Sequence, residues 1–155
     1  MFLLQEETMT KEIFMSFVFY DKLQNSRFKK VEKFFNLLFE AFDKDGSGQI
    51  TFEEYIVGKK QFESEDIKDN IRFIFRLLDI SHDKNIERKE IVRFLDIMNS
   101  CGAELNSDNK SNVQYAKKMM EDFDLDKNGY LDEEEFIDGI AQNKEYVSFI
   151  KSIKS

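Results

Sequence analysis

The chain has 155 residues, of which 41% are hydrophobic and 35% charged, a balance that excludes a wholly disordered polymer. Its 31 acidic against 23 basic residues give a formal net charge of −8, which disfavours binding to nucleic acid or to an anionic membrane by general attraction. Cations and basic segments of a partner are the natural counterparts of such a chain.

The first stretch, MFLLQEETMTKE, has a short apolar run and acids where a signal peptide carries bases. We expect no membrane-spanning segment, because no run approaches ~18 apolar residues. We also expect no myristoyl anchor, because Phe2 stands where N-myristoylation requires glycine. The single cysteine, Cys101, cannot form an internal disulfide, so we expect a reducing, cytoplasmic setting.

The first acidic loop, DKDGSGQITFEE, occupies residues 43–54. Oxygen-bearing groups at places 1, 3, 5, 7, 9 and 12 of a twelve-residue loop can surround Ca²⁺, with place 7 contributing its backbone carbonyl. Gly48 fills the sixth place, where the backbone turns with positive φ. The candidate ligands are Asp43, Asp45, Ser47, Gln49, Thr51 and Glu54.

The second loop, DISHDKNIERKE at residues 79–90, departs from this pattern at two places. Ser81 offers a neutral oxygen at the third place, and Lys84 replaces glycine at the sixth. Positive φ costs a non-glycine residue roughly 1 kcal/mol or a little more, and the ammonium repels a bound cation. We therefore predict a site that is weak or filled by Mg²⁺, with the candidate ligands Asp79, Ser81, Asp83, Asn85, Glu87 and Glu90.

The third loop, DLDKNGYLDEEE at residues 124–135, follows the polar linker SCGAELNSDNKSN and has Gly129 at its sixth place. Two complete matches in one chain make chance composition a negligible explanation. We predict strong calcium sites at the first and third loops. The candidate ligands of the third are Asp124, Asp126, Asn128, Tyr130, Asp132 and Glu135.

The segments that flank the loops have helical periodicity. Residues 8, 5, 4 and 1 places before each loop are apolar: Phe35, Leu38, Phe39 and Phe42, then Ile71, Ile74, Phe75 and Leu78, then Ala116, Met119, Met120 and Phe123. Apolar stripes also follow the loops, fullest at Ile91, Phe94, Leu95 and Met98. The eighth places, Ile50, Ile86 and Leu131, are aliphatic, as in loops that join by a short antiparallel ladder. The pattern predicts an all-α array of paired helix-loop-helix units.

These loops and helices resemble the EF-hand. The loop starts are 36 and 45 residues apart, and together with the segments EEYIVGKKQ, NIERKEIVRFLDIM and EEFIDGIAQNKEYVSFI this resembles the neuronal calcium sensor and calcineurin B-like branch more than calmodulin. The resemblance covers roughly residues 30–150 and implies four hands in two pairs, the first often degenerate. We expect an N-terminal lobe at residues 1–63 and a C-terminal lobe with a tail helix at residues 64–155.

The first hand departs from the family pattern. Phe14, Phe17 and Val18 fit its exit helix, but its loop would begin near Met1 without an acid at the first place, so we expect a truncated or degenerate hand. The loop at Asp43 then has either a remnant partner near residues 8–10 or an unpaired edge, which invites dimerisation. Monomer and dimer both stay open.

The function indicated is that of a calcium sensor that exposes a hydrophobic groove and regulates a partner protein by holding an amphipathic helix. The 17 phenylalanines favour this function, with a groove lined by Phe35, Leu38, Phe39, Phe52, Tyr55, Phe62, Phe73, Phe75, Met119 and Met120. The tail NKEYVSFIKSIKS predicts a short helix that caps the groove. The alternatives are a calcium buffer and a constitutive structural component like a light chain. An enzyme is not expected, because His82 and Cys101 lack a catalytic context and no glycine-rich phosphate loop occurs.

Overall fold

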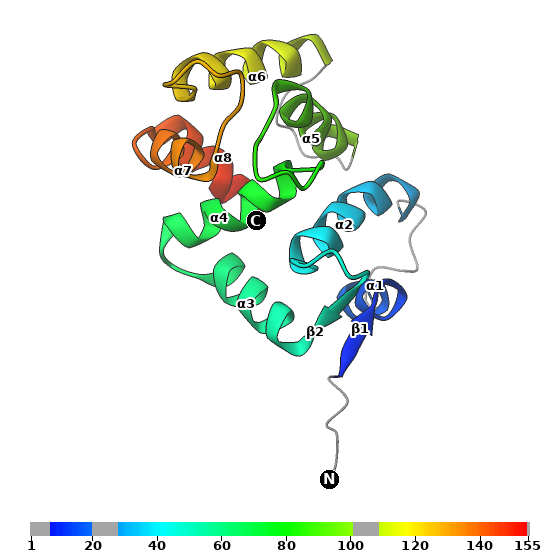
Figure 1. Ribbon diagram of the computed structural model, residues 1–155. Coiled ribbons are helices and arrows are strands. Elements are labelled where there is room, and N and C mark those ends of the chain that lie inside the picture. The colour runs from blue at the N-terminus through cyan, green and yellow to red at the C-terminus, as the bar shows by residue number, and fades with distance from the viewer. Residues whose placement is uncertain (1–6, 20–27, 101–108, 155) are drawn as a thin grey trace.

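A computed structural model describes residues 7–19, 28–100 and 109–154 (Figure 1). Cys101 and most of the polar linker lie outside these ranges. Within them the chain forms eight helices and one two-stranded sheet, so the predicted helical array is confirmed. The elements are β1 (Thr8–Thr10), α1 (Lys11–Phe19), α2 (Phe28–Phe42), β2 (Gln49–Thr51), α3 (Phe52–Glu63), α4 (Ile67–Leu78), α5 (Arg88–Ser100), α6 (Asn109–Phe123), α7 (Glu133–Ala141) and α8 (Lys144–Lys154).

Residues at the ninth and twelfth places of the loops also start the helices that follow. The Thr51 hydroxyl accepts a hydrogen bond from the Glu54 amide (3.1 Å), and the Glu54 carboxylate accepts one from the Thr51 amide (2.9 Å). Asp132 and Glu135 repeat this reciprocal capping box at the start of α7. A capping box satisfies two backbone donors at a helix N-terminus. The loop chemistry and the helix boundary are therefore fixed by the same side chains.

The loops pair through their eighth places. Ile86 and Leu131 form an antiparallel bridge, with backbone N–H···O distances of 2.8 and 2.9 Å in the two directions. Ile50 pairs with Met9, because β1 lies antiparallel to β2. The predicted remnant strand is thus confirmed, and the alternative of an unpaired edge at this loop is wrong.

The strand register also locates the remnant of the first hand. Since Met9 lies opposite Ile50, it takes the eighth place of a loop whose first place is Phe2 and whose twelfth is Ile13. The expected start near Met1 therefore moves by one residue. Neither Phe2 nor Ile13 offers a side-chain oxygen, so β1 and α1 resemble the second half of a hand without its metal ligands.

Helix α4 is the central element of the core. It packs against α2, α3, α5, α7 and α8 (Figure 1), and its predicted stripe is buried at all four positions: Ile71, Ile74, Phe75 and Leu78. Phe73 is buried as well, with its ring 5.3 Å from that of Phe42 and 5.4 Å from that of Phe62. One cluster of buried apolar side chains runs from α1 to α8. The division into lobes at residues 63 and 64 stays a prediction.

Two glycines bring the helices of a hand close together. A Cβ on Gly58 would lie 2.5 Å from the Phe42 ring, and a Cβ on Gly139 would lie 2.4 Å from the Phe123 ring. In both hands the phenylalanine directly precedes the loop and the glycine takes the sixteenth place from the loop start. In the middle hand the larger side chain takes the sixteenth place instead. Phe94 lies there and Leu78 precedes the loop, and both are buried.

Candidate metal-binding loops

The first loop gathers three carboxylates around its turn. Oxygens of Asp43, Asp45 and Glu54 lie within 4.8 Å of one another. Asp43 is buried and accepts hydrogen bonds from the amides of Ser47 (3.0 Å) and Gly48 (2.8 Å). Gly48 has φ +84°, as the sequence predicts for the sixth place. Hydrogen bonds from the Ser47 amide and hydroxyl lower the pKa of Asp45, so this carboxylate favours its charged form.

The remaining candidates of the first loop border this cluster. The Ser47 hydroxyl lies 3.3 Å from Asp43 Oδ1 and donates to the backbone carbonyl of Gln49 at 2.8 Å. The Thr51 hydroxyl lies 3.3 Å from Glu54 Oε2. All six predicted ligand positions of this loop therefore lie close together.

The last loop repeats the arrangement. Oxygens of Asp124, Asp126 and Glu135 lie within 4.8 Å of one another, and Asp124 accepts from the amides of Asn128 (3.2 Å) and Gly129 (3.0 Å). Gly129 has φ +86°. The Asn128 side-chain oxygen accepts from the Tyr130 amide (2.8 Å), and Asp132 caps α7 beside Glu135.

The donor sets of these two loops fit a hard dication. Each brings three carboxylates together, and their mutual repulsion is relieved by a positive ion. Carboxylate, hydroxyl, amide and carbonyl oxygens are the ligands that Ca²⁺ prefers. The acidic clusters therefore support calcium at both loops.

The middle loop has the same backbone hydrogen bonds but a different donor set. Asp79 accepts from the amides of Lys84 (2.9 Å) and Asp83 (3.2 Å), and Glu90 accepts from those of Ser81 (2.8 Å) and Glu87 (2.8 Å). Within the part of the chain that the structure describes, three-acid clusters form at the first and last loops and not here. The reason is the neutral serine at the third place, where the other loops carry aspartate.

Three further features distinguish the middle loop from the other two. Lys84 has φ +65°, so the predicted left-handed backbone at the sixth place is confirmed for a residue with a Cβ. Burial raises the pKa of Asp79 against hydrogen bonds from Lys84 and Asp83 that lower it. Glu87, the ninth-place candidate, forms an ion pair with Lys89 at 2.6 Å. The Asn85 amide donates to Asp83 Oδ1 at 2.9 Å, as the seventh-place amide donates to the fifth-place side chain in the other two loops.

The fourth place of each loop is also left-handed, a feature that the sequence pattern did not predict. The φ angles are +69° at Gly46, +59° at His82 and +57° at Lys127. Glycine at this place in the first loop was the available signal. His82 is exposed, and its Nε2 lies 3.5 Å from the Glu40 carboxylate of α2.

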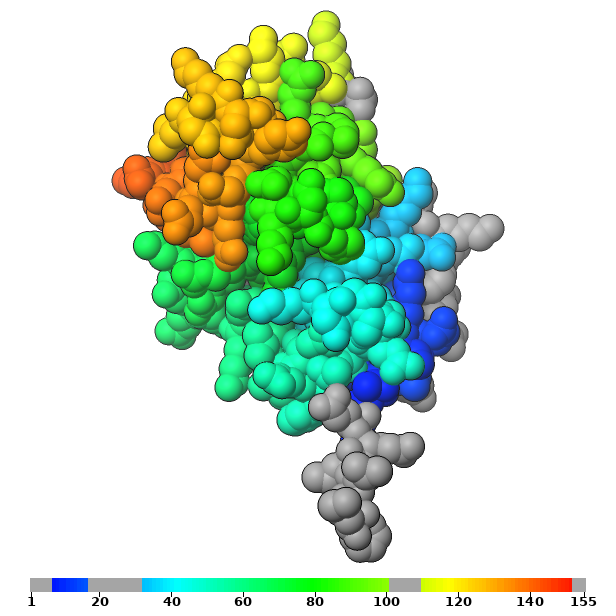
Figure 2. Space-filling view, viewed as in Figure 1, coloured from blue at the N-terminus to red at the C-terminus, as the bar shows by residue number. Residues whose placement is uncertain are grey.

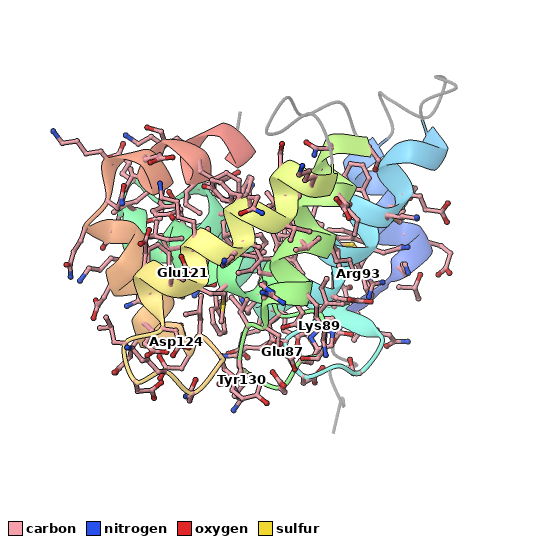
Figure 3. All side chains as sticks on the ribbon, turned by 90° about the horizontal axis from the view of Figure 1, so that it is seen from above. Glu87, Lys89, Arg93, Glu121, Asp124 and Tyr130 are labelled. Atoms are coloured by element: carbon pink, nitrogen blue, oxygen red, sulfur yellow. The ribbon has the colours of Figure 1, made fainter. Side chains whose placement is uncertain are left out.

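The loops gather on one side of the molecule. Seen from above, the labelled Asp124 and Tyr130 of the last loop and Glu87 of the middle loop lie at one edge (Figure 3). In the space-filling view the green surface of the middle hand lies between the cyan part of the first loop region and the orange C-terminal part (Figure 2).

Comparison with known families agrees with this geometry. The description "EF-hand domain pair" matches residues 68–141, and "EF hand" matches residues 35–57. The chain is an EF-hand protein. The two matches include all three acidic loops, the pair covering the bridged middle and last loops.

Several known proteins are similar to this EF-hand chain. The calcineurin B subunit of Candida glabrata is 36% identical over 100 residues, covering 64% of this chain and 55% of the relative. The type 2 calcineurin B subunit of Mus musculus is 32% identical over 116 residues, covering 72% and 63%. Guanylyl cyclase-activating protein 1 of Gallus gallus is 26% identical over 115 residues, covering 72% and 55%. The chain thus spans less than two thirds of each relative's length, and the predicted resemblance to this branch is confirmed at modest identity.

Proposed function

We propose that this EF-hand protein is a calcium-dependent regulator that binds an amphipathic helix of a partner protein. The observation that carries the proposal is the combination of two three-carboxylate loops with helices that leave apolar surface open beside the first loop. Two of the similar proteins are named as a subunit and one as an activating protein, which supports a role exerted on another protein. We propose that the protein itself has no catalytic activity.

The ions are assigned by the donor sets. We propose Ca²⁺ at the first loop, held by Asp43, Asp45, Ser47, Gln49, Thr51 and Glu54, and at the last, held by Asp124, Asp126, Asn128, Tyr130, Asp132 and Glu135. Bound Ca²⁺ supplies the positive charge that offsets each carboxylate cluster. The middle loop is proposed as a weaker site, open to Mg²⁺, because it lacks a third-place carboxylate and carries Lys84.

A hollow of about 470 Å³ beside α3 and α4 is the proposed helix site. It is lined in part by Phe42, Phe52, Val57 and Arg76. Phe52 is 71% exposed and Val57 40% exposed, which is unusual for large apolar side chains. Glu7 and Glu53, which are not among the proposed calcium ligands, border the same hollow, so a partner helix with basic residues would complement it.

The predicted groove lining needs a correction at four positions. Phe39, Phe73, Phe75 and Met119 are buried in the core, so they do not line an open groove in this structure. The other predicted residues are partly or largely accessible: Phe35, Leu38, Phe52, Tyr55, Phe62 and Met120. The proposed helix site is therefore smaller than the predicted groove and lies nearer the first loop.

The C-terminal tail, α8, is proposed to cover apolar surface of the C-terminal half, and it contributes none of the described residues that line the helix site at the first loop. Tyr146 and Ile150 of α8 are buried, and α8 packs against α4 and α7. The Tyr146 ring lies 4.7 Å from that of Phe123, and its hydroxyl donates to Asp122 at 3.1 Å. These contacts support the hypothesis that α8 covers apolar surface of the C-terminal half. The side chain of Ile153 lies outside the described residues.

Fluorescence of a hydrophobic dye tests the proposal and separates it from the alternatives. We expect Ca²⁺ to increase dye binding to the full chain, and deletion of residues 144–155 to increase it further. A pure calcium buffer would show no calcium-dependent increase, because buffers barely open. A constitutive structural component would show high dye binding in chelator that calcium leaves unchanged. Either result would refute calcium-dependent exposure.

Calorimetric titration of the same protein tests the ion assignment. We expect two tight calcium sites and a third weak one. Glu54→Gln and Glu135→Gln should each remove one tight site, because each replaces the carboxylate at the twelfth place. Three equally tight sites, or one alone, would contradict the assignment.

A further inference from the structure

A hollow of about 630 Å³ lies between the N-terminal helices and the middle hand, on a different part of the surface from the proposed helix site. Three cations at its edge come from three helices: Lys11 from α1, Lys33 from α2 and Arg93 from α5. Arg93 lies on the α2 side of α5, while Glu121 and Asp124 lie on the other side (Figure 3). We define the basic cleft by Lys11, Lys33, Arg93, Leu37, Ile80 and Ile97.

The wall of the basic cleft is partly apolar. Leu37 is 5% exposed and Ile97 is 7% exposed, and both belong to the core, while Ile80 of the middle loop is half-buried against it. Ile80 keeps the most accessible surface of the three, so an aliphatic side chain of an occupant would be buried mainly against Ile80. A purely ionic occupant would leave the apolar part of the wall exposed to water.

The charges of the cleft are unequally paired. Among the described residues, none of the three cations has a carboxylate oxygen within 4.0 Å. The cleft also has two acids: Glu40 lies 3.5 Å from His82, which is charged only when protonated, and Asp96 accepts a hydrogen bond from the neutral Asn112 amide at 2.7 Å, so both carboxylates keep their negative charge. The lining therefore carries three cations against two acids, a local excess of one positive charge in a chain whose net charge is −8.

We propose that the basic cleft binds an acidic segment of a partner protein. Its carboxylates pair with Lys11, Lys33 and Arg93, and an aliphatic side chain rests on Ile80. The overall negative charge argues against an extended polyanion such as nucleic acid or an anionic membrane surface, which would meet repulsion outside the cleft. A short acidic peptide fits within the local positive edge. The site is separate from the helix site and does not depend on it.

Amide-resolved NMR titration of the full chain tests the proposal. The probe is the peptide acetyl-Leu-Glu-Glu-Leu-Asp-Glu-amide, added at a fixed, buffered free Ca²⁺ concentration so that chelation by the peptide is constant. We expect the amide signals of Leu37, Ile80 and Ile97 to shift together. A peptide with Gln and Asn in place of the acids should bind far more weakly, and added salt should weaken binding because exposed charges are screened.

Charge reversal supplies the matched control. The triple variant Lys11→Glu, Lys33→Glu, Arg93→Glu should weaken peptide binding roughly tenfold or more, since three exposed ion pairs are lost together. The control variant Lys59→Glu, Lys60→Glu, Lys117→Glu changes the net charge equally at sites outside the cleft and should bind nearly as tightly as the parent chain. Equal weakening in both variants would refute the proposal, and so would shifts confined to the acidic loops.

Discussion

Replacing Lys84 by glycine is the sharpest perturbation of the middle loop. Lys84 stands at the sixth place with φ +65°, in the left-handed region that L-residues adopt at a cost of about 1–2 kcal/mol. Its side chain is exposed, so charge repulsion from its ammonium is screened and contributes about 1 kcal/mol or less. The backbone strain therefore outweighs the charge repulsion. Lys84→Gly should increase calcium affinity or stability more than Lys84→Gln does.

The free energy gained by Lys84→Gly should appear either in the calcium affinity of the middle loop or in the stability of the folded chain. If the loop adopts positive φ on binding alone, Lys84→Gly should raise the affinity of the middle loop about five- to thirtyfold. If the loop holds positive φ throughout, the gain should instead appear as about 1–2 kcal/mol of added stability in chelator, because the strain is relieved in every folded state. The hydrogen bond from the amide of residue 84 to Asp79, 2.9 Å in length, is retained by glycine.

Calorimetric calcium titration and urea denaturation in chelator measure the two terms on the same variants. Lys127→Gly is the matched control, because it relieves a similar φ of +57° at the fourth place of the last loop and should leave the middle loop unchanged. The reasoning would be refuted if Lys84→Gly surpassed Lys84→Gln in neither assay. Backbone strain would then not be the defect of this loop.

Two further predictions concern packing behind the loops. Gly139→Ala should lower the free energy of unfolding by up to about 2 kcal/mol, since overpacking against Phe123 costs ~1–3 kcal/mol and helix propensity returns ~1 kcal/mol. Adding Phe123→Leu should recover the lost stability in urea denaturation. A higher midpoint for the single variant than for the parent chain would contradict the close contact. Burial, aided by the hydrogen bond to Asp122, raises the pKa of Tyr146 above its usual ~10. Its stabilising contribution is then complete below pH ~10 and is lost as pH rises through the folded-state pKa. Stability measured from pH ~9 to ~12 should therefore fall more steeply for the parent chain than for Tyr146→Phe, and parallel curves would show that α8 docking does not depend on this hydroxyl.

The loops could be predicted from sequence because their chemistry is local. Oxygens at fixed places, glycine at the sixth place and an aliphatic residue at the eighth are all set within twelve residues. The helix stripes were equally readable, and the four stripe positions of α4 are all buried. Even the bridge between Ile86 and Leu131 followed from one place in each loop.

The features that the sequence did not predict are contacts between elements that lie apart in the chain, which a local pattern does not connect. Phe73 was expected to line a groove. It lies off the α4 stripe, but rings from α2 and α3 enclose it on that side. The Phe123–Gly139 contact joins two helices across a whole loop, and the pairing of His82 with Glu40 joins different hands. Such contacts depend on how α4 and its neighbours pack, which a helical period does not specify.

Arg76 of α4 is electrostatically coupled to acids of the first and last loops. Burial lowers the pKa of this guanidinium, while the charges of Glu133, near the end of the last loop, and Glu54, the twelfth residue of the first, raise it. The side chain also donates to Gln61 of α3 and lies 5.4 Å from the centre of the Phe73 ring. A dication that neutralises Glu54 would weaken one of the attractions that hold this buried cation in place. Calcium at the first loop would therefore change the electrostatic balance of the helix against which α3 and α7 both pack.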